Sequence, residues 1–332
     1  MTEMIKFEPL LKQTLWGGSK IAAFKHLDTN LENIGESWEI SGVDGSVSVV
    51  AEGPLKGRSL SELMMQQKGL LVGQSNYERF GNEFPLLVKF IDATHDLSIQ
   101  VHPDDEVARR HGYHHGKTEM WYCLGGSATT PPDGDMTGTV PPMLYCGLKK
   151  AITPQQYEQM VANHTITGAL ARYEVHDGDA FFIPAGRVHS IGAGCFVAEI
   201  QQTSDVTYRI YDFNRRDKDG NLRQLHTKEA SESIDYTVLD DYRTNYGRGK
   251  NERRQIVACQ QFTVAVYDLD RPMLLDYSEL DSFVILMGLE GSATLDTGDE
   301  QTSLNAGETV LVAATAREIT VRGQARFIEA YV

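Results

Sequence analysis

The feature that most constrains the fold of this chain is a short motif that occurs twice. Gly126-Ser127-Ala128-Thr129 recurs as Gly291-Ser292-Ala293-Thr294, each time after an apolar run. A second glycine-led apolar segment follows each copy, beginning at Gly178 in the first and at Gly307 in the second. Short strands that repeat between turns predict a mainly β chain with two tandem β-barrels or sandwiches.

Gly126 and Gly178 of the first copy are much farther apart than Gly291 and Gly307 of the second, so the first copy contains an insertion. Its first part has Pro131-Pro132, Gly134, Gly138 and Pro141-Pro142, which predict a loop. A helix is expected to begin at Thr153-Pro154, because proline is favoured at the first helical position. Three more short helices are expected, one from the capping-box residue Ser59 to about Gln67, one after Asp104, and one over 227–234.

Strand patterns cover much of the remaining chain. They are Gly35–Ser41, Val47–Val50, Pro85–Ile91, Gly168–Val175, Ala180–Ile183 and Cys195–Gln201. Leu15–Gly18 is interpreted as a turn. Residues 245–254 are polar and contain glycine, as linkers do, so we expect a first domain of 1–247 and a second of 248–332.

An amide, an imidazole and a carboxylate occur together in the first copy. Gln100 and His102 lie two residues apart in an apolar run that Pro103 ends, and alternate residues of a strand share a face. Glu119 begins the next apolar run. Together these groups suggest a metal site, although singly the glutamine could be a core amide and the histidine a buried ring bonded to a neighbour.

The second copy lacks these groups. Val284 stands where the first copy has Glu119, seven residues before the repeated motif. Pro184-Ala185-Gly186-Arg187-Val188-His189 is replaced by Ala313-Ala314-Thr315-Ala316-Arg317-Glu318. The second copy is therefore interpreted as structural.

Charge and cysteine content exclude several classes of protein. The 332 residues have a formal net charge of -15, which argues against general binding of nucleic acid and requires local Lys or Arg side chains for any anionic ligand. The four cysteines show no CxxC spacing and predict reduced thiols. No signal peptide or membrane-length apolar run is evident, so a cytoplasmic protein is expected.

The motifs resemble those of a known superfamily. Gly178-x5-Pro184-x-Gly186-x2-His189 resembles the second cupin motif, and Glu119-x6-Gly126 resembles the end of the first. Gln100-x-His102 in place of His-x-His, with Lys117-x-Glu119 and Arg209, resembles the short bacterial form of the type I mannose-6-phosphate isomerases. The likeness runs from Trp16-Gly17 through Trp38-Glu39 to about Asn214 and more loosely to the C-terminus, and it departs from the family at Thr118, where proline is common.

The resemblance implies a tandem cupin fold, with a catalytic jelly-roll domain and a degenerate second one. It implies one divalent metal, usually zinc, held by Gln100, His102, Glu119 and His189. It further implies interconversion of mannose 6-phosphate and fructose 6-phosphate through an enediol(ate), in a monomer or homodimer. Arg209 and Lys117 are the expected catalytic cations, and Glu199 is expected to face the same cavity; Glu199, Lys117 and a water on the metal remain alternatives for the base.

Two rival functions stay open at this point. An iron-dependent cupin dioxygenase would need the usual His-x-His pair and neither Lys117 nor Arg209. A sugar-binding bicupin without catalysis would bind a hexose phosphate and not convert it. Arg209 could also simply pair with one of the many acidic side chains.

Overall fold

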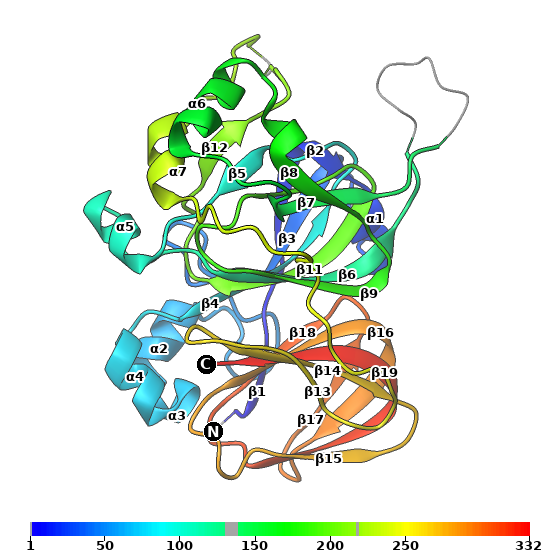
Figure 1. Ribbon diagram of the computed structural model, residues 1–332. Coiled ribbons are helices and arrows are strands. Elements are labelled where there is room, and N and C mark those ends of the chain that lie inside the picture. The colour runs from blue at the N-terminus through cyan, green and yellow to red at the C-terminus, as the bar shows by residue number, and fades with distance from the viewer. Residues whose placement is uncertain (1, 130–138, 217–218) are drawn as a thin grey trace.

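The chain forms two stacked β-units in the computed structural model, which describes residues 2–129, 139–216 and 219–332 (Figure 1). Within these ranges the strands make three sheets, and none of the three closes into a barrel. The first β-unit consists of a six-stranded and a five-stranded sheet, and the second is built on an eight-stranded sheet. The prediction of a mainly β chain with two tandem units is confirmed.

Two sheets face each other in the first β-unit. The six-stranded sheet has the order β2 (Leu10–Gly18), β3 (Ile34–Ile40), β4 (Leu86–Asp92), β11 (Cys195–Gln202), β6 (Glu119–Gly126), β9 (Asp177–Ile183). The five-stranded sheet has the order β12 (Tyr208–Tyr211), β5 (Ile99–Val101), β10 (His189–Ile191), β7 (Met143–Leu148), β8 (Leu170–Glu174). Cys123 and Val197 of the first sheet pack with Leu144 and Ile191 of the second, so the core lies between them.

The second β-unit surrounds a core of its own, in which Leu286, Ile319 and Phe327 are fully buried. Its central strands, in order, are β1 (Met4–Lys6), β18 (Thr309–Val312), β16 (Val284–Asp296), β19 (Glu318–Tyr331), β14 (Thr263–Leu269) and β13 (Arg254–Ala258). β15 (Met273–Asp276) pairs with β19, and β17 (Gln301–Asn305) pairs with β16.

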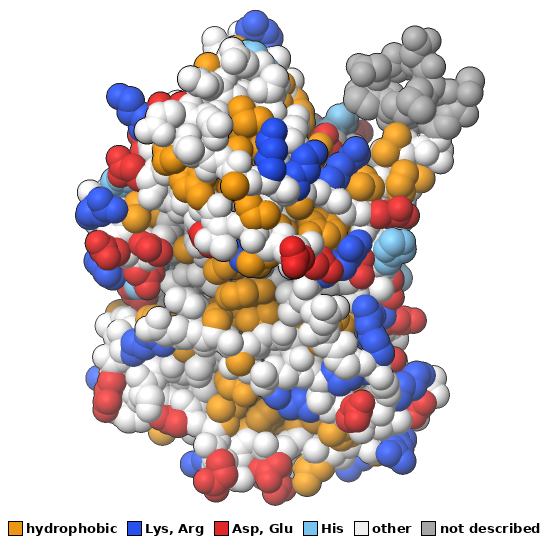
Figure 2. Space-filling view, in the orientation of Figure 1, with side chains coloured by type: hydrophobic (Ala, Val, Ile, Leu, Met, Phe, Trp, Pro, Cys, Tyr) orange, Lys and Arg blue, Asp and Glu red, His pale blue; other side chains and the backbone are white. Residues whose placement is uncertain are grey.

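An apolar interface joins the two units. Val88 of β4 and Ile200 of β11 belong to one buried cluster with Ile285 of β16 and Ile328 of β19. These side chains point away from the core of their own unit, since alternate residues of a strand point to opposite faces. Figure 2 shows hydrophobic side chains at the level where the units meet. Both faces of β4 and β11 are therefore buried.

Short helices lie in the connections between the strands. They are α1 (Lys20–Phe24), α2 (Leu60–Gln67), α3 (Gly69–Val72), α4 (Gln74–Phe80), α5 (Asp105–Arg110), α6 (Pro154–Ala162), a 3-10 turn (Ile166–Ala169) and α7 (Thr227–Ser233). Ser59 and Thr153 form the capping boxes that start α2 and α6, and Asp104 caps α5. Within the described ranges, no helix has the length and apolar character that crossing a membrane requires.

Two local predictions were wrong. Leu15–Gly18 is not a turn but the end of β2, because an irregular register lets Gly18 pair with Ile34. Val47–Val50 is not a strand, since Val49 and Val50 form only isolated bridges, to Ser59 and Phe7. A run of four residues has too few ladder positions to hold a register when its partners are loop residues. The proline-rich loop predicted from 131 lies largely outside the described residues.

The boundary at residue 247 stays a prediction. Residues 234–253 carry no helix or strand in the described chain, and β13 begins at Arg254. The N-terminal strand β1 nevertheless pairs with β18 of the second unit, with Ile5 opposite Leu311. The second unit thus includes one strand from the start of the chain.

Candidate active site

The candidate ligands come from both sheets of the first β-unit. In the five-stranded sheet, Gln100 of β5 lies opposite His189 of β10 on one side and Arg209 of β12 on the other. His102 follows β5 directly, and Glu119 is the first residue of β6 in the facing sheet. The strand order thus brings together residues that are far apart in the sequence.

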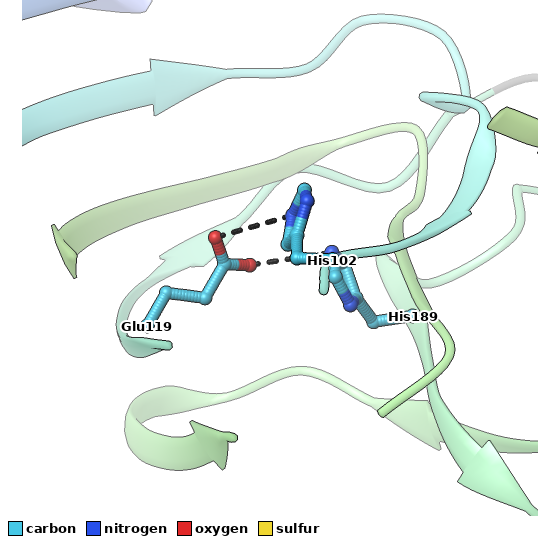
Figure 3. A group of neighbouring side chains, drawn as sticks. All are labelled: His102, Glu119 and His189. Carbon is cyan, nitrogen blue, oxygen red and sulfur yellow. Dashed lines mark ion pairs between the residues drawn. The ribbon is translucent and has the colours of Figure 1, made fainter. Parts of the chain in front are cut away.

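Three of these side chains converge on one point. The ligand atoms of His102, Glu119 and His189 all lie within 4.8 Å of one another. The two Glu119 oxygens face different rings, Oε2 at 3.5 Å from His102 Nε2 and Oε1 at 3.3 Å from His189 Nε2 (Figure 3). All three residues are buried.

Both imidazoles are held with Nε2 toward the carboxylate. His102 Nδ1 lies 2.8 Å from the carbonyl oxygen of Val206 and His189 Nδ1 lies 2.8 Å from that of Arg187, so each Nδ1–H donates to backbone. Burial lowers the pKa of His102 well below its usual value and that of His189 to about 4, so both rings are neutral and each Nε2 carries a lone pair.

Among the described residues, Glu119 Oε1 has no hydrogen-bond partner, and Oε2 has the ion pair with Lys117 Nζ at 3.0 Å. Lys117 offsets the repulsion between the lone pairs on the His102 side, but those of His189 Nε2 and Glu119 Oε1 face each other at 3.3 Å. A divalent metal would meet this need, because imidazole and carboxylate are common zinc ligands and backbone acceptors at Nδ1 are typical of metal-binding histidines. The donor set therefore fits a divalent metal.

Gln100 can supply a fourth ligand atom. Its Nε2 lies 3.3 Å from His189 Nε2. A half-turn of the amide exchanges nitrogen and oxygen, which would place Oε1 beside the same ring nitrogen. The position predicted from the Gln-x-His spacing therefore lies at the cluster.

Gly186 fixes the loop that leads to His189. Its backbone has φ +87°, a left-handed conformation that favours glycine, and a Cβ there would lie 2.9 Å from the carbonyl oxygen of Ser233. Its N–H donates to the carbonyl oxygen of His102 at 2.8 Å. The glycine of the motif thus ties the two histidine-bearing segments together.

Lys117 lies beside Glu119 at the centre of the site. Its Nζ lies 3.0 Å from Glu119 Oε2 and 3.3 Å from His102 Nε2. Burial and the nearby charge of Glu199 raise the pKa of Glu119 to about 7, against the opposing effect of Lys117. Lys117 is buried and precedes β6, so it contributes a fixed positive charge beside the cluster.

Glu199 lies beside the cluster and has partners that the sequence did not indicate. Its Oε1 lies 3.0 Å from Lys89 Nζ, and its Oε2 accepts a 2.8 Å hydrogen bond from Trp121 Nε1. Burial alone would raise the pKa of Glu199, but Lys89 and Lys117 outweigh burial and lower it. The sequence analysis did not identify Lys89 or Trp121 as site residues. The available signal for Lys89 was its place as a single lysine inside the fully buried strand Leu86–Asp92.

Glu199, Lys89 and Trp121 line a cavity of about 880 Å³. Gln100, Lys117 and Arg209 line the same cavity. The Arg209 Nη1 donates to the carbonyl oxygen of Gln224 at 3.1 Å, and its Nε is buried without a partner in the described chain. The acidic neighbour Asp212 is bound instead by Arg215 and Arg223. Arg209 therefore keeps donors free at the cavity.

Comparison with known proteins places the chain in a family. Residues 4–124 match the family model described as phosphomannose isomerase type I, catalytic domain, and residues 252–332 match that of the mannose-6-phosphate isomerase cupin domain. The chain is 31% identical to the mannose-6-phosphate isomerase ManA of Bacillus subtilis, over 100% of this chain and 99% of that protein. The chain belongs to the mannose-6-phosphate isomerase family.

Other members agree with this assignment. The mannose-6-phosphate isomerase of Streptococcus mutans is 29% identical over 100% of this chain and 99% of its own length. The crystal structure of the Bacillus subtilis mannose 6-phosphate isomerase superposes with a TM-score of 0.87 at 28% identity, over 100% of both chains. Structures of phosphomannose isomerase from Salmonella typhimurium, at 15% identity and a TM-score of 0.80 over 99% of both chains, share the fold. The resemblance inferred from the motifs is confirmed.

Proposed function

We propose that this chain interconverts D-mannose 6-phosphate and D-fructose 6-phosphate, with one divalent metal, zinc, bound by Gln100, His102, Glu119 and His189. The observation that carries the proposal is the convergence of a buried carboxylate and two neutral imidazoles beside Lys117, which lines a cavity together with Gln100 and Arg209. Membership of the family supplies the substrate pair.

The reaction moves a proton between C1 and C2 of the sugar through an enediol(ate). When bound, the metal supplies positive charge that polarises the sugar oxygens, an effect of several kcal/mol on the barrier. Lys117 and Arg209 provide further positive charge for the phosphate and for the developing enediolate oxygen. Both side chains line the cavity, so each can reach the substrate.

A base must take the proton from carbon. Glu199 is a carboxylate of lowered pKa that lines the cavity, so it is ionised at neutral pH and able to accept a proton. Lys117 carries its charge beside Glu119 and suits proton donation to oxygen. We assign Glu199 as the base and Lys117 as the acid, and Arg209 as the group that holds anionic oxygen.

A coupled assay with mannose 6-phosphate, before and after chelation, tests the proposal. Turnover is expected to vanish with the chelator and to return with Zn²⁺. His102→Ala should abolish both turnover and bound zinc, while the matched variant His176→Ala, at an exposed histidine outside the cavity, should change neither. Near-normal turnover in the His102 variant would overturn the assignment.

Two further measurements, of oxygen uptake and of hexose-phosphate binding, separate the rival functions. Oxygen uptake with an organic substrate would indicate an iron dioxygenase, and binding of hexose phosphate without conversion would indicate a sugar-binding protein. The cytoplasmic location and the monomeric or homodimeric state stay predictions.

A further inference from the structure

A second cavity, of about 320 Å³, lies in the second β-unit. Strand register shows where its lining residues correspond to those of the first unit. The repeated glycines Gly126 and Gly291 align β6 with β16, so that Trp121 and Leu286 correspond, each five residues before its glycine. This correspondence does not depend on likeness of side chains.

Glu329 is the counterpart of Glu199. Glu199 of β11 lies opposite Trp121 of β6 and Lys89 of β4. Glu329 of β19 lies opposite Leu286 of β16 and Ala265 of β14, the strands in the equivalent places. Both carboxylates are buried, and each lines the cavity of its own unit.

The ligand-bearing strands correspond as well. Glu318 stands where the first copy has His189, and it lies opposite Asp276 just as His189 lies opposite Gln100. Asp276 is therefore the counterpart of Gln100, and both line the cavities of their units. The second cavity thus occupies the same place in its unit as the candidate active site in the first.

The metal-binding groups themselves are replaced. Ser278, two residues beyond Asp276, stands where the first unit has His102, and Val284 stands in place of Glu119. In the second unit the four ligand positions are therefore occupied by Asp276, Ser278, Val284 and Glu318. Among the described residues, the one compact group of metal-ligating side chains is the His102, Glu119 and His189 cluster of the first unit.

One wall of the second cavity is polar and contains an ion pair. Glu329 accepts hydrogen bonds from the hydroxyls of Tyr267 at 3.1 Å and Tyr277 at 2.8 Å, and from Arg253 Nε at 2.6 Å. The Arg253 guanidinium lies over the Tyr331 ring, 5.7 Å from its centroid. The tyrosine hydroxyls donate their protons to Glu329, so their oxygens remain as acceptors around this ion pair.

The charge of the lining decides between ligand classes. Among the described lining residues, Arg253 is the single cation, and Asp276, Glu279 and Glu329 carry negative charge. An anionic ligand would meet an excess of carboxylates. A neutral polyhydroxylated ligand suits this lining, because carboxylates and tyrosine oxygens accept hydrogen bonds from sugar hydroxyls.

We propose that the second β-unit binds an uncharged hexose in this cavity, separately from the metal-dependent site. The cavity volume lies within the range of about 300–1,000 Å³ that is usual for small-molecule sites. The proposal goes beyond the isomerase function and stands whether or not the first cavity turns over hexose phosphate.

Equilibrium dialysis of the full chain against labelled D-mannose and D-fructose tests this inference, with a matched pair of variants. Ser278→Trp fills the second cavity and Ser98→Trp fills the first. Ser98→Trp is expected to keep hexose binding, and Ser278→Trp to lose the corresponding site while keeping isomerase activity. Loss of all hexose binding in Ser98→Trp, or unchanged binding stoichiometry in Ser278→Trp, would overturn the proposal.

A milder variant protects the test against misfolding. Asp276→Ala removes one carboxylate at the rim and should weaken hexose binding about tenfold, measured in the Ser98→Trp background. Mannose 6-phosphate should bind this background more weakly than mannose, because its charge faces the acidic rim. Unchanged affinity for mannose in the Asp276 variant, or tighter binding of the phosphate ester, would contradict the assignment of a neutral hexose.

Discussion

Lys89→Met should destabilise the metal-free protein in a way that depends on pH. Lys89 and Glu199 are both buried, 7% and 3% exposed, and their charges lie 3.0 Å apart. Methionine occupies much of the volume of the lysine side chain but carries no charge. Glu199 is then left with the Trp121 hydrogen bond and the more distant Lys117. An uncompensated charge left by breaking a buried pair costs about 3–5 kcal/mol.

The sign of the pH dependence follows from Glu199. In the wild type its folded pKa is lowered, so its contribution to stability is present above the unfolded pKa and is lost as the pH falls through the folded pKa. Without Lys89, burial dominates and the folded pKa rises above the unfolded value. The penalty in the variant should then grow as the pH rises above the unfolded pKa.

Urea unfolding at pH 5 and pH 8 measures this difference. We expect the variant to lose about 3–5 kcal/mol at pH 8 and clearly less at pH 5, where Glu199 binds a proton. The double variant Lys89→Met/Glu199→Gln should recover most of the loss at pH 8. The exposed control Lys250→Met should stay within about 0.5 kcal/mol of wild type. Equal losses at both pH values, or no recovery in the double variant, would refute the reasoning.

Three further predictions concern the first β-unit. Zn²⁺ at about 100 times its Kd should stabilise the metal-free protein by about 2.7 kcal/mol, seen as a raised Tm, and His189→Ala should remove this shift. Arg209→Ala should abolish turnover of mannose 6-phosphate and leave the circular dichroism spectrum unchanged, whereas retained turnover would exclude its proposed role. Gly147→Ala should lose at least about 1–2 kcal/mol in urea unfolding, because Gly147 has φ +76° and a Cβ would overlap the Tyr242 ring; wild-type stability would contradict this steric argument.

Gln100, His102 and Glu119 could be proposed as ligands from the residues themselves, whereas His189 was added through the resemblance to the second cupin motif. Gln100 and His102 lie two residues apart at the end of one strand. His189 follows Gly186, which has the left-handed backbone conformation that favours glycine. Lys89 could not be found in this way. Its partners Glu36 and Glu199 come from the two strands on either side of β4, so its role depends on sheet order, which strand patterns alone do not give.

The short runs were harder to assign for the same reason. Val47–Val50 has strand-forming residues, but propensity counts for little where no neighbouring strand offers a ladder. Conversely, the glycines of Trp16-Gly17-Gly18 suggested a turn, yet the chain continues in β2, where Gly17 lies directly against the backbone of Asn33. In both places the partner segment, and not the local sequence, decides the conformation.

The alternation along β11 explains why the second β-unit matters to the site even without binding metal. Glu199 lines the cavity, while its neighbours Ala198 and Ile200 point the other way and pack in the interface cluster with Ile328. The same division holds on β4, where Lys89 faces the cavity and Val88 and Phe90 face the second unit. The strands β4 and β11, which carry the ion pair beside the candidate metal centre, are thus packed on their opposite face against apolar side chains of the second unit. Because a displaced strand would move the charged side chain with its backbone, the packing of the second unit fixes the positions of Lys89 and Glu199.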